Sequence, residues 1–163
     1  MNTATLGLLA TNPEAKMKVL IAVEDKEFGE TIIDYIKKNN WNTDTKFKIL
    51  HVIEPYELDE GVDVTYLPFL EDTKEQARAA AKTLVNSLTI KLKDKFVNCS
   101  IESDVAEGNP KEILLKEIEK WSADLLCLGT HGRRGVSKFL LGSVSQALAS
   151  HAPCAVLIVK KST

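Results

Sequence analysis

Four residues near the C-terminus have the types and spacing of a phosphate-binding loop: Gly129, Gly132, Gly142 and Ser143. The apolar run 124–128 before them predicts a buried strand, and the run 144–150 after them predicts a helix. Glycines let a backbone approach an anion closely, and the N–H groups at a helix start point toward it. The order of strand, glycine-rich loop and helix therefore predicts a site for a phosphate group.

The local charge of this loop also favours an anion. Residues 130–145 carry three cations, Arg133, Arg134 and Lys138, and no acid, although the whole chain has a net charge of −2. A helix start favours an anion by about 0.3–1 kcal/mol where it is exposed. The alternative interpretation is structural: Ser143 is only an N-cap, the glycines only shape a turn, and the cations are solvated.

The spacing of the four residues resembles the nucleotide-binding signature of the universal stress protein family, which is Gly, two residues, Gly, nine residues, Gly, then Ser or Thr. Further segments resemble the family's first strand, second strand, turn into the third helix and last strand: 18–24, 47–53, 105–110 and 153–159. The resemblance covers most of residues 17–160. We therefore expect an N-terminal tail over 1–16 and one domain over 17–161.

Apolar strands alternate with amphipathic helices along the chain. Strands are expected at 17–24, 47–53, 97–105, 124–128 and 155–159, and helices at 28–38, 71–93, 110–121 and 144–150. Such alternation implies parallel strands with right-handed crossovers and helices on both faces. The expected fold is α/β, a single-domain doubly wound five-stranded parallel sheet, and the resemblance implies the Rossmann-like strand order 3-2-1-4-5.

In such sheets a ligand lies beyond the carboxyl ends of the strands, where the strand order reverses. The resemblance implies an ATP site there, between the first and fourth strands. The adenine end would be formed by Ala22, Val23, Glu24 and Val52. The phosphate end would be formed by Gly129, Gly132, Gly142, Ser143, Val144 and Ser145. Any Mg²⁺ would arrive with the nucleotide phosphates.

Individual roles follow from this placement. Gly129 and Gly132 would remove Cβ atoms that keep ribose and phosphate at a distance. The hydroxyls of Ser143 and Ser145 would donate to phosphate oxygens. Glu24 would accept a hydrogen bond from adenine or ribose, and it is a departure from the family, which usually has Asp at this position.

The three histidines do not predict a catalytic centre. His131 lies in the loop and could contact a phosphate, but the resemblance does not require it. His51 is interpreted as a packing or hydrogen-bonding residue, and His151 as a helix-terminal residue. The sequence contains no Walker pattern, nucleophile elbow or metal-ligand spacing of histidines and carboxylates. We expect no efficient enzyme, and at most slow ATP hydrolysis.

Composition limits the protein class. With 163 residues, 44% hydrophobic and 27% charged, the chain is long enough for one core. Its net charge gives no reason to expect nucleic acid. No apolar run approaches the about 20 residues that span a bilayer, and the N-terminus is a poor signal peptide, so the default location is cytoplasmic. Three cysteines, Cys99, Cys127 and Cys154, are expected to be buried reduced thiols in strands.

Two function classes remain open. The first is a regulatory protein of the stress response in which ATP occupancy changes loop order or assembly. The second is an interaction or scaffold module of the same fold that binds no nucleotide. The intact glycine signature favours the first. An adenylate-forming enzyme of related fold is a third, weaker alternative because its motifs are missing.

Two further segments predict interactions. The strand 155–159 is almost wholly apolar, and the implied order places it at a sheet edge, so we expect a homodimer formed through it. In the alternative, the N-terminal tail covers this edge within one chain. The acidic connection 54–72 is long enough to act as a lid or a partner contact, or it is a surface loop.

Overall fold

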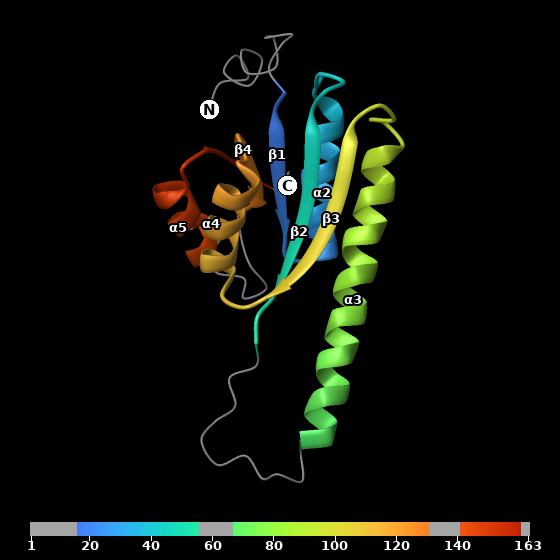
Figure 1. The fold of residues 1–163 in the computed structure, drawn as a ribbon, viewed down its shortest axis with the longest axis vertical. Helices are drawn as coiled ribbons and strands as arrows, with labels where there is room; N and C mark the ends of the chain where they lie inside the picture. Colours follow the sequence, from blue (N-terminus) through green and yellow to red (C-terminus); the bar gives the residue numbers. More distant parts are fainter. Residues whose placement is uncertain (1–15, 56–66, 131–140, 161–163) are drawn as a thin grey trace.

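The computed structural model describes residues 16–55, 67–130 and 141–160, and of residues 67–70 it describes the backbone alone (Figure 1). The elements, in chain order, are β1 Lys18–Val23, α2 Lys26–Lys38, β2 Lys46–Ile53, α3 Leu67–Lys93, β3 Ser100–Glu107, α4 Pro110–Trp121, β4 Leu125–Gly129, α5 Ser143–His151 and β5 Ala155–Val159. The strands form one sheet in the order β3-β2-β1-β4-β5, with every neighbouring pair parallel. The predicted doubly wound sheet and its strand order are confirmed.

Helices cover both faces of the sheet, α2 and α3 on one side and α4 and α5 on the other (Figure 1). Successive residues of a strand point to opposite faces. In β1, Ile21 packs with Ile33 of α2 and Leu88 of α3, while Leu20 packs with Ile118 of α4. All five are fully buried. A central strand covered on both faces is apolar along its buried length, which is why residues 19–23 of β1 are a continuous hydrophobic run.

Several element boundaries differ from the expected ones, and two of the differences have a clear physical cause. Helix α2 begins at Lys26 rather than Phe28, because the Asp25 carboxylate accepts a hydrogen bond of 2.8 Å from the Phe28 N–H and caps the helix earlier. Strand β3 begins at Ser100 rather than Val97. The Val97 side chain is 80% exposed in the turn after α3, so its apolar character did not mark a strand.

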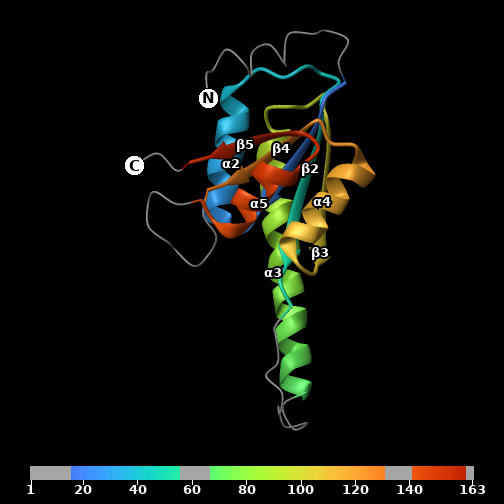
Figure 2. The same cartoon turned by 90° about the vertical axis from the view of Figure 1, so that its left-hand side faces the viewer.

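The long helix α3 extends beyond the carboxyl edge of the sheet (Figures 1 and 2). Its 27 residues span about 40 Å, whereas the eight residues of β2 span about 26 Å. Arg78 of α3 forms a two-point ion pair with Glu107, the last residue of β3. The connection expected over 54–72 is shorter in the structure, because its last residues, 67–72, belong to α3. Residues 56–66 lie outside the described residues.

The three thiols are free, as expected, but only Cys127 of β4 is fully buried. Cys99 and Cys154 are half-buried and lie just before β3 and β5 rather than within them. Burial raises the pKa of all three thiols. A raised pKa leaves little thiolate at neutral pH, so these cysteines have the character of packing residues.

Candidate functional site

The carboxyl ends of β1, β2 and β4 meet at one edge of the sheet. Val23, the last residue of β1, is opposite His51 of β2. Ile21 is opposite Cys127 of β4, and continuing this register by two residues places Val23 beside Gly129. The chain leaves β1 and β4 for helices on opposite faces of the sheet. The strand order therefore reverses between two strand ends that are far apart in the sequence.

Helix α5 begins at this point without a side-chain cap. Its N-cap is Gly142, with φ −61° and ψ 155°, and its first turn contains no acidic residue. Ser143 is the first helical residue and is exposed. The alternative interpretation of Ser143 as the N-cap is therefore wrong. The Gly142 N–H donates a hydrogen bond of 2.8 Å to the carbonyl of Thr130, which follows directly after β4, and this bond fixes Gly142.

The starts of α2 and α4 differ from that of α5. The Asp25 carboxylate caps α2, and the Asn109 side chain accepts a hydrogen bond of 3.0 Å from the Lys111 N–H of α4. Each of these helices also has an acidic residue in its first turn, Glu27 in α2 and Glu112 in α4. These groups oppose the positive end of the helix dipole. The first turn of α5 has no such group.

Gly129 packs closely against a side chain of α2. An added Cβ at this position would lie 2.9 Å from Cδ1 of Phe28, in the first turn of α2. Real Cβ atoms essentially never come so close to another heavy atom. The expected role of Gly129 was close approach of ribose and phosphate. The sequence did not reveal its packing role, because Phe28 belongs to a different βα unit.

Ser145 has a different partner from the expected phosphate. Its side chain is 5% exposed, and its hydroxyl donates a hydrogen bond of 2.8 Å to the Gly129 carbonyl. The hydroxyl therefore joins α5 to the end of β4. Val144, its neighbour, is half-buried against the core beneath α4 and α5.

The predicted adenine end lies on β1 and β2. Ala22 and Val52 are half-buried on the face covered by α4 and α5, and Val23 is buried on the opposite face. Glu24 is half-buried and follows directly after β1. His51 is buried, and its Nδ1 lies 2.9 Å from the Val23 carbonyl. The hydrogen-bonding interpretation of His51 is confirmed.

Gly132, His131 and the cations Arg133, Arg134 and Lys138 all lie outside the described residues. The remaining predicted site residues lie on β1, β2, β4 and α5 at the carboxyl edge. His151 is the last residue of α5, as expected, with Nδ1 2.9 Å from the Ala147 carbonyl.

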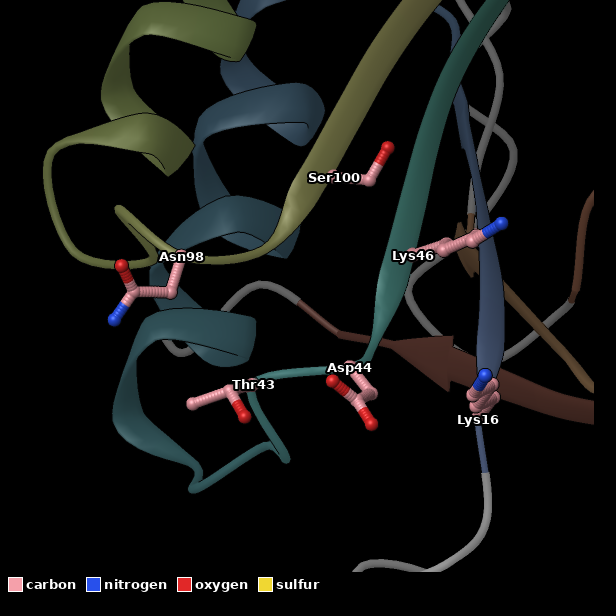
Figure 3. Close-up of a pocket in the computed structure, with 6 residues that line it drawn as sticks. All are labelled: Lys16, Thr43, Asp44, Lys46, Asn98 and Ser100. Carbon is pink, nitrogen blue, oxygen red and sulfur yellow. The ribbon is translucent and has the colours of Figure 1, made fainter.

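A shallow hollow of about 260 Å³ lies elsewhere, at the amino edge of the sheet (Figure 3). It is lined by Lys16, Thr43, Asp44, Lys46, Asn98 and Ser100. Lys46 and Ser100 begin β2 and β3, so the hollow is at the opposite edge from the switch point. All six side chains are exposed, which is typical of a solvated surface depression.

No group of three or more His, Cys, Asp or Glu side chains in residues 16–55, 71–130 and 141–160 is arranged to hold a metal ion. Among the described helices, none combines the length and apolar character needed to cross a membrane.

Comparisons with known proteins agree with the fold. Universal stress protein A homolog 2 of Coxiella burnetii is 28% identical over 152 residues, which cover 88% of this chain and 94% of that protein. The solved structure of the hypothetical protein MJ0577 aligns with a TM-score of 0.73 at 23% identity, covering 91% of this chain and 98% of that one.

Two other similar structures contain nucleotides. A universal stress protein family member from Arabidopsis thaliana, with AMP bound, has a TM-score of 0.61 at 19% identity and covers 90% of this chain and 93% of its own. A universal stress protein in complex with cAMP has a TM-score of 0.58 at 19% identity, and the alignment covers 90% of this chain and 98% of that one. At such identities these structures show a shared fold. The sequence pattern of the universal stress protein family matches residues 16–160, and the chain therefore belongs to that family.

Proposed function

We propose that this protein binds ATP at the switch point between β1 and β4 and acts as a cytoplasmic, nucleotide-responsive regulator of the stress response. The observation that carries the proposal is the start of α5. It is a helix N-terminus without a side-chain cap or an acidic first turn, located where the strand order reverses. The unbroken spacing of Gly129, Gly132, Gly142 and Ser143 supports the same site. The AMP and cAMP complexes of related folds support an adenine nucleotide as the ligand.

In this proposal the phosphates are bound chiefly by the backbone. The N–H groups of Ser143, Val144 and Ser145 belong to the first turn of α5, where a helix supplies no carbonyl partners. The exposed Ser143 hydroxyl adds a donor. Gly132 completes the phosphate end, and any Mg²⁺ is carried by the phosphates themselves.

The adenosine end is proposed to lie against the ends of β1 and β2, at Ala22, Val23, Glu24 and Val52. The Glu24 carboxylate accepts from the adenine amino group or a ribose hydroxyl. A carboxylate close to the phosphates would repel the ligand, so the contacts proposed for Glu24 are with the adenosine end.

ATP hydrolysis in this proposal is slow at most. A fast hydrolase needs a general base within reach of the attacking water. Both histidines in the described part of the chain place Nδ1 against a backbone carbonyl, His51 at Val23 and His151 at Ala147. Regulation would then follow occupancy rather than turnover.

We also propose that the protein forms a homodimer through β5. This strand is at an edge of the sheet, and it carries the apolar sequence Ala-Val-Leu-Ile-Val. Ala155 is exposed, and Val156 and Ile158 are only half-buried within one chain. An apolar edge strand with open backbone groups is a template for pairing with a second copy.

A direct experiment tests the nucleotide proposal. The protein, purified without added nucleotide, is denatured and the supernatant is analysed for adenine nucleotides by chromatography. The stripped and refolded chain is then titrated with ATP. Release of adenine nucleotide, or ATP binding by the stripped chain, is expected. The absence of both release and binding would favour the scaffold alternative.

A further inference from the structure

His51 makes a buried contact with the end of the neighbouring strand. Its side chain is 5% exposed, and its Nδ1 lies 2.9 Å from the carbonyl oxygen of Val23, the residue opposite it in the β1–β2 register. A carbonyl oxygen only accepts hydrogen bonds, so Nδ1 carries the hydrogen. The His51 ring therefore donates a hydrogen bond from Nδ1 to the Val23 carbonyl oxygen.

The contact between His51 and the Val23 carbonyl also fixes the orientation of the peptide unit that joins Val23 to Glu24. The Val23 carbonyl and the Glu24 N–H belong to one planar trans peptide unit, so they point in opposite directions and turn together. Val23 is the last residue of β1, and beyond it the strand no longer constrains the chain. Holding the Val23 oxygen thus sets the direction of the Glu24 N–H and the point from which the Glu24 side chain leaves the backbone.

Glu24 is also held from its other side. The Asp25 carboxylate accepts from the Phe28 N–H at 2.8 Å, and the Asp25 carbonyl accepts from the Gly29 N–H at 3.0 Å. Asp25 is thereby fixed to the first turn of α2. Glu24 is the single residue between two anchored neighbours, and its backbone is prepared before any ligand binds.

We infer that His51 is a positioning residue for the adenosine end of the nucleotide site. The inference depends on the proposed nucleotide site and extends it to a residue that does not contact the ligand. His51 alternates with Phe47 and Ile49 along β2 and belongs to the face covered by α2 and α3. It acts through the Val23–Glu24 peptide. Because a backbone that is already ordered loses less entropy on binding, removing this anchor weakens the contacts of adenosine.

The phosphate end is not served by His51. Its proposed donors belong to the start of α5, which is anchored separately by the Gly142 N–H on the Thr130 carbonyl. The inference therefore predicts a selective effect. Ligands that contain adenosine depend on His51, and tripolyphosphate, which has the phosphates alone, does not.

Two substitutions at this position separate positioning from packing. His51→Leu fills the space without a donor, whereas the side-chain amide of His51→Asn can donate from about the position of Nδ1. In calorimetric titrations, His51→Leu is expected to weaken the affinity for AMP and ATP about tenfold and to leave the affinity for tripolyphosphate unchanged. His51→Asn is expected to recover most of the lost affinity.

His151 provides a matched control. Its Nδ1 also lies 2.9 Å from a backbone carbonyl, that of Ala147, but it ends α5 near the amino edge of the sheet. His151→Leu is expected to leave the affinities for AMP and tripolyphosphate unchanged. A general sensitivity to losing a histidine hydrogen bond would affect both substitutions.

A second measurement uses the wild-type chain alone. In ¹⁵N-edited NMR of the imidazole rings, His51 is expected to show the Nδ1–H tautomer, and its signals are expected to shift with AMP but not with tripolyphosphate. Equal AMP affinity in wild type and His51→Leu, or equal weakening of AMP and tripolyphosphate, would overturn the role of His51 while the nucleotide site stands. Wild-type protein that binds neither AMP nor ATP would instead overturn the proposed function.

Discussion

The Ser145 hydroxyl donates a hydrogen bond of 2.8 Å to the carbonyl of Gly129, sixteen residues earlier in the chain. A second bond of 2.8 Å runs from the Gly142 N–H to the Thr130 carbonyl. Together they tie Gly142 and Ser145, at the start of α5, to the adjacent residues Gly129 and Thr130, at the end of β4. The backbone donors proposed for the phosphates are thus fixed relative to the sheet by contacts that lie outside residues 131–140.

Ser145→Ala should lower both stability and phosphate affinity. The substitution leaves the half-buried Gly129 carbonyl without this donor, and the free energy of unfolding should fall by about 1–2 kcal/mol. Urea denaturation measures this change. Ser150→Ala is the matched control on the same helix, because the exposed Ser150 hydroxyl also donates to a backbone carbonyl, that of Gln146 at 3.1 Å. Equal effects of the two substitutions would contradict a special role for Ser145.

Gly129→Ala should be destabilising, and the cause should be Phe28. The new Cβ would overlap the Phe28 ring, at 2.9 Å from Cδ1, and overpacking of this kind costs about 1–3 kcal/mol. In a Phe28→Ala background the same substitution should cost much less. A double-mutant cycle in urea measures the coupling between the two positions. Additive effects would show that Gly129 is not constrained by Phe28.

The stability of residues 71–77, in the part of α3 that extends beyond the sheet, should depend on the ion pair between Arg78 and Glu107. The hydrogen bond from Arg78 lowers the pKa of the Glu107 carboxyl from 4.5. The stabilisation from this carboxylate is therefore complete above pH 4.5 and is lost as the pH falls through the lowered pKa of the folded state. Glu107→Gln at neutral pH should speed amide hydrogen exchange in residues 71–77 and leave exchange in β1 unchanged.

Glu75→Gln is the control for this prediction. Glu75 lies 3.7 Å from the same Arg78 guanidinium but is three residues away on the same helix, so it does not connect α3 to the sheet. Equal exchange rates in residues 71–77 for both variants would show that Glu107 is not the anchor.

A lysine pair on β5 should separate the proposed dimer. Val156→Lys with Ile158→Lys places two charges on the edge strand, and light scattering should then give the mass of one chain, 18.0 kDa, instead of two. The matched control is Ser100→Lys with Glu102→Lys on β3, the opposite edge, which should remain dimeric. Circular dichroism checks that both variants fold. A wild-type mass of one chain at micromolar concentration would exclude the dimer.

The sequence predicted the sheet well because its signals are local. Continuous apolar runs marked the central strands, and the alternation of strands and helices implied parallel pairing; the order 3-2-1-4-5 came from the family resemblance and is confirmed. The expected start of α2 is two residues late, because the cap at Asp25 determines the start more than the first apolar residue does. The first turn of α3, residues 67–70, differs from the expectation because it belongs to the segment 54–72, which the sequence predicts to be a connection.

The contacts of the candidate site were less predictable, because they join residues far apart in the chain. Nothing near Ser145 in the sequence indicates that its hydroxyl bonds the Gly129 carbonyl, and nothing near Gly129 indicates the Phe28 ring. The contact between His51 and the Val23 carbonyl likewise depends on the strand register. Sequence spacing predicts the site, and the three-dimensional packing identifies which side chains would support its backbone.

Calorimetric titration of the stripped wild-type chain and Gly142→Val with ATP tests the nucleotide site most directly. Gly142 has φ −61° and ψ 155°, which a valine also adopts, so the variant should fold, and its side chain should block the phosphate path. The account predicts binding of one ATP per wild-type chain and loss of most of that binding in Gly142→Val. No binding by the wild type, or the same affinity in both chains, would contradict it.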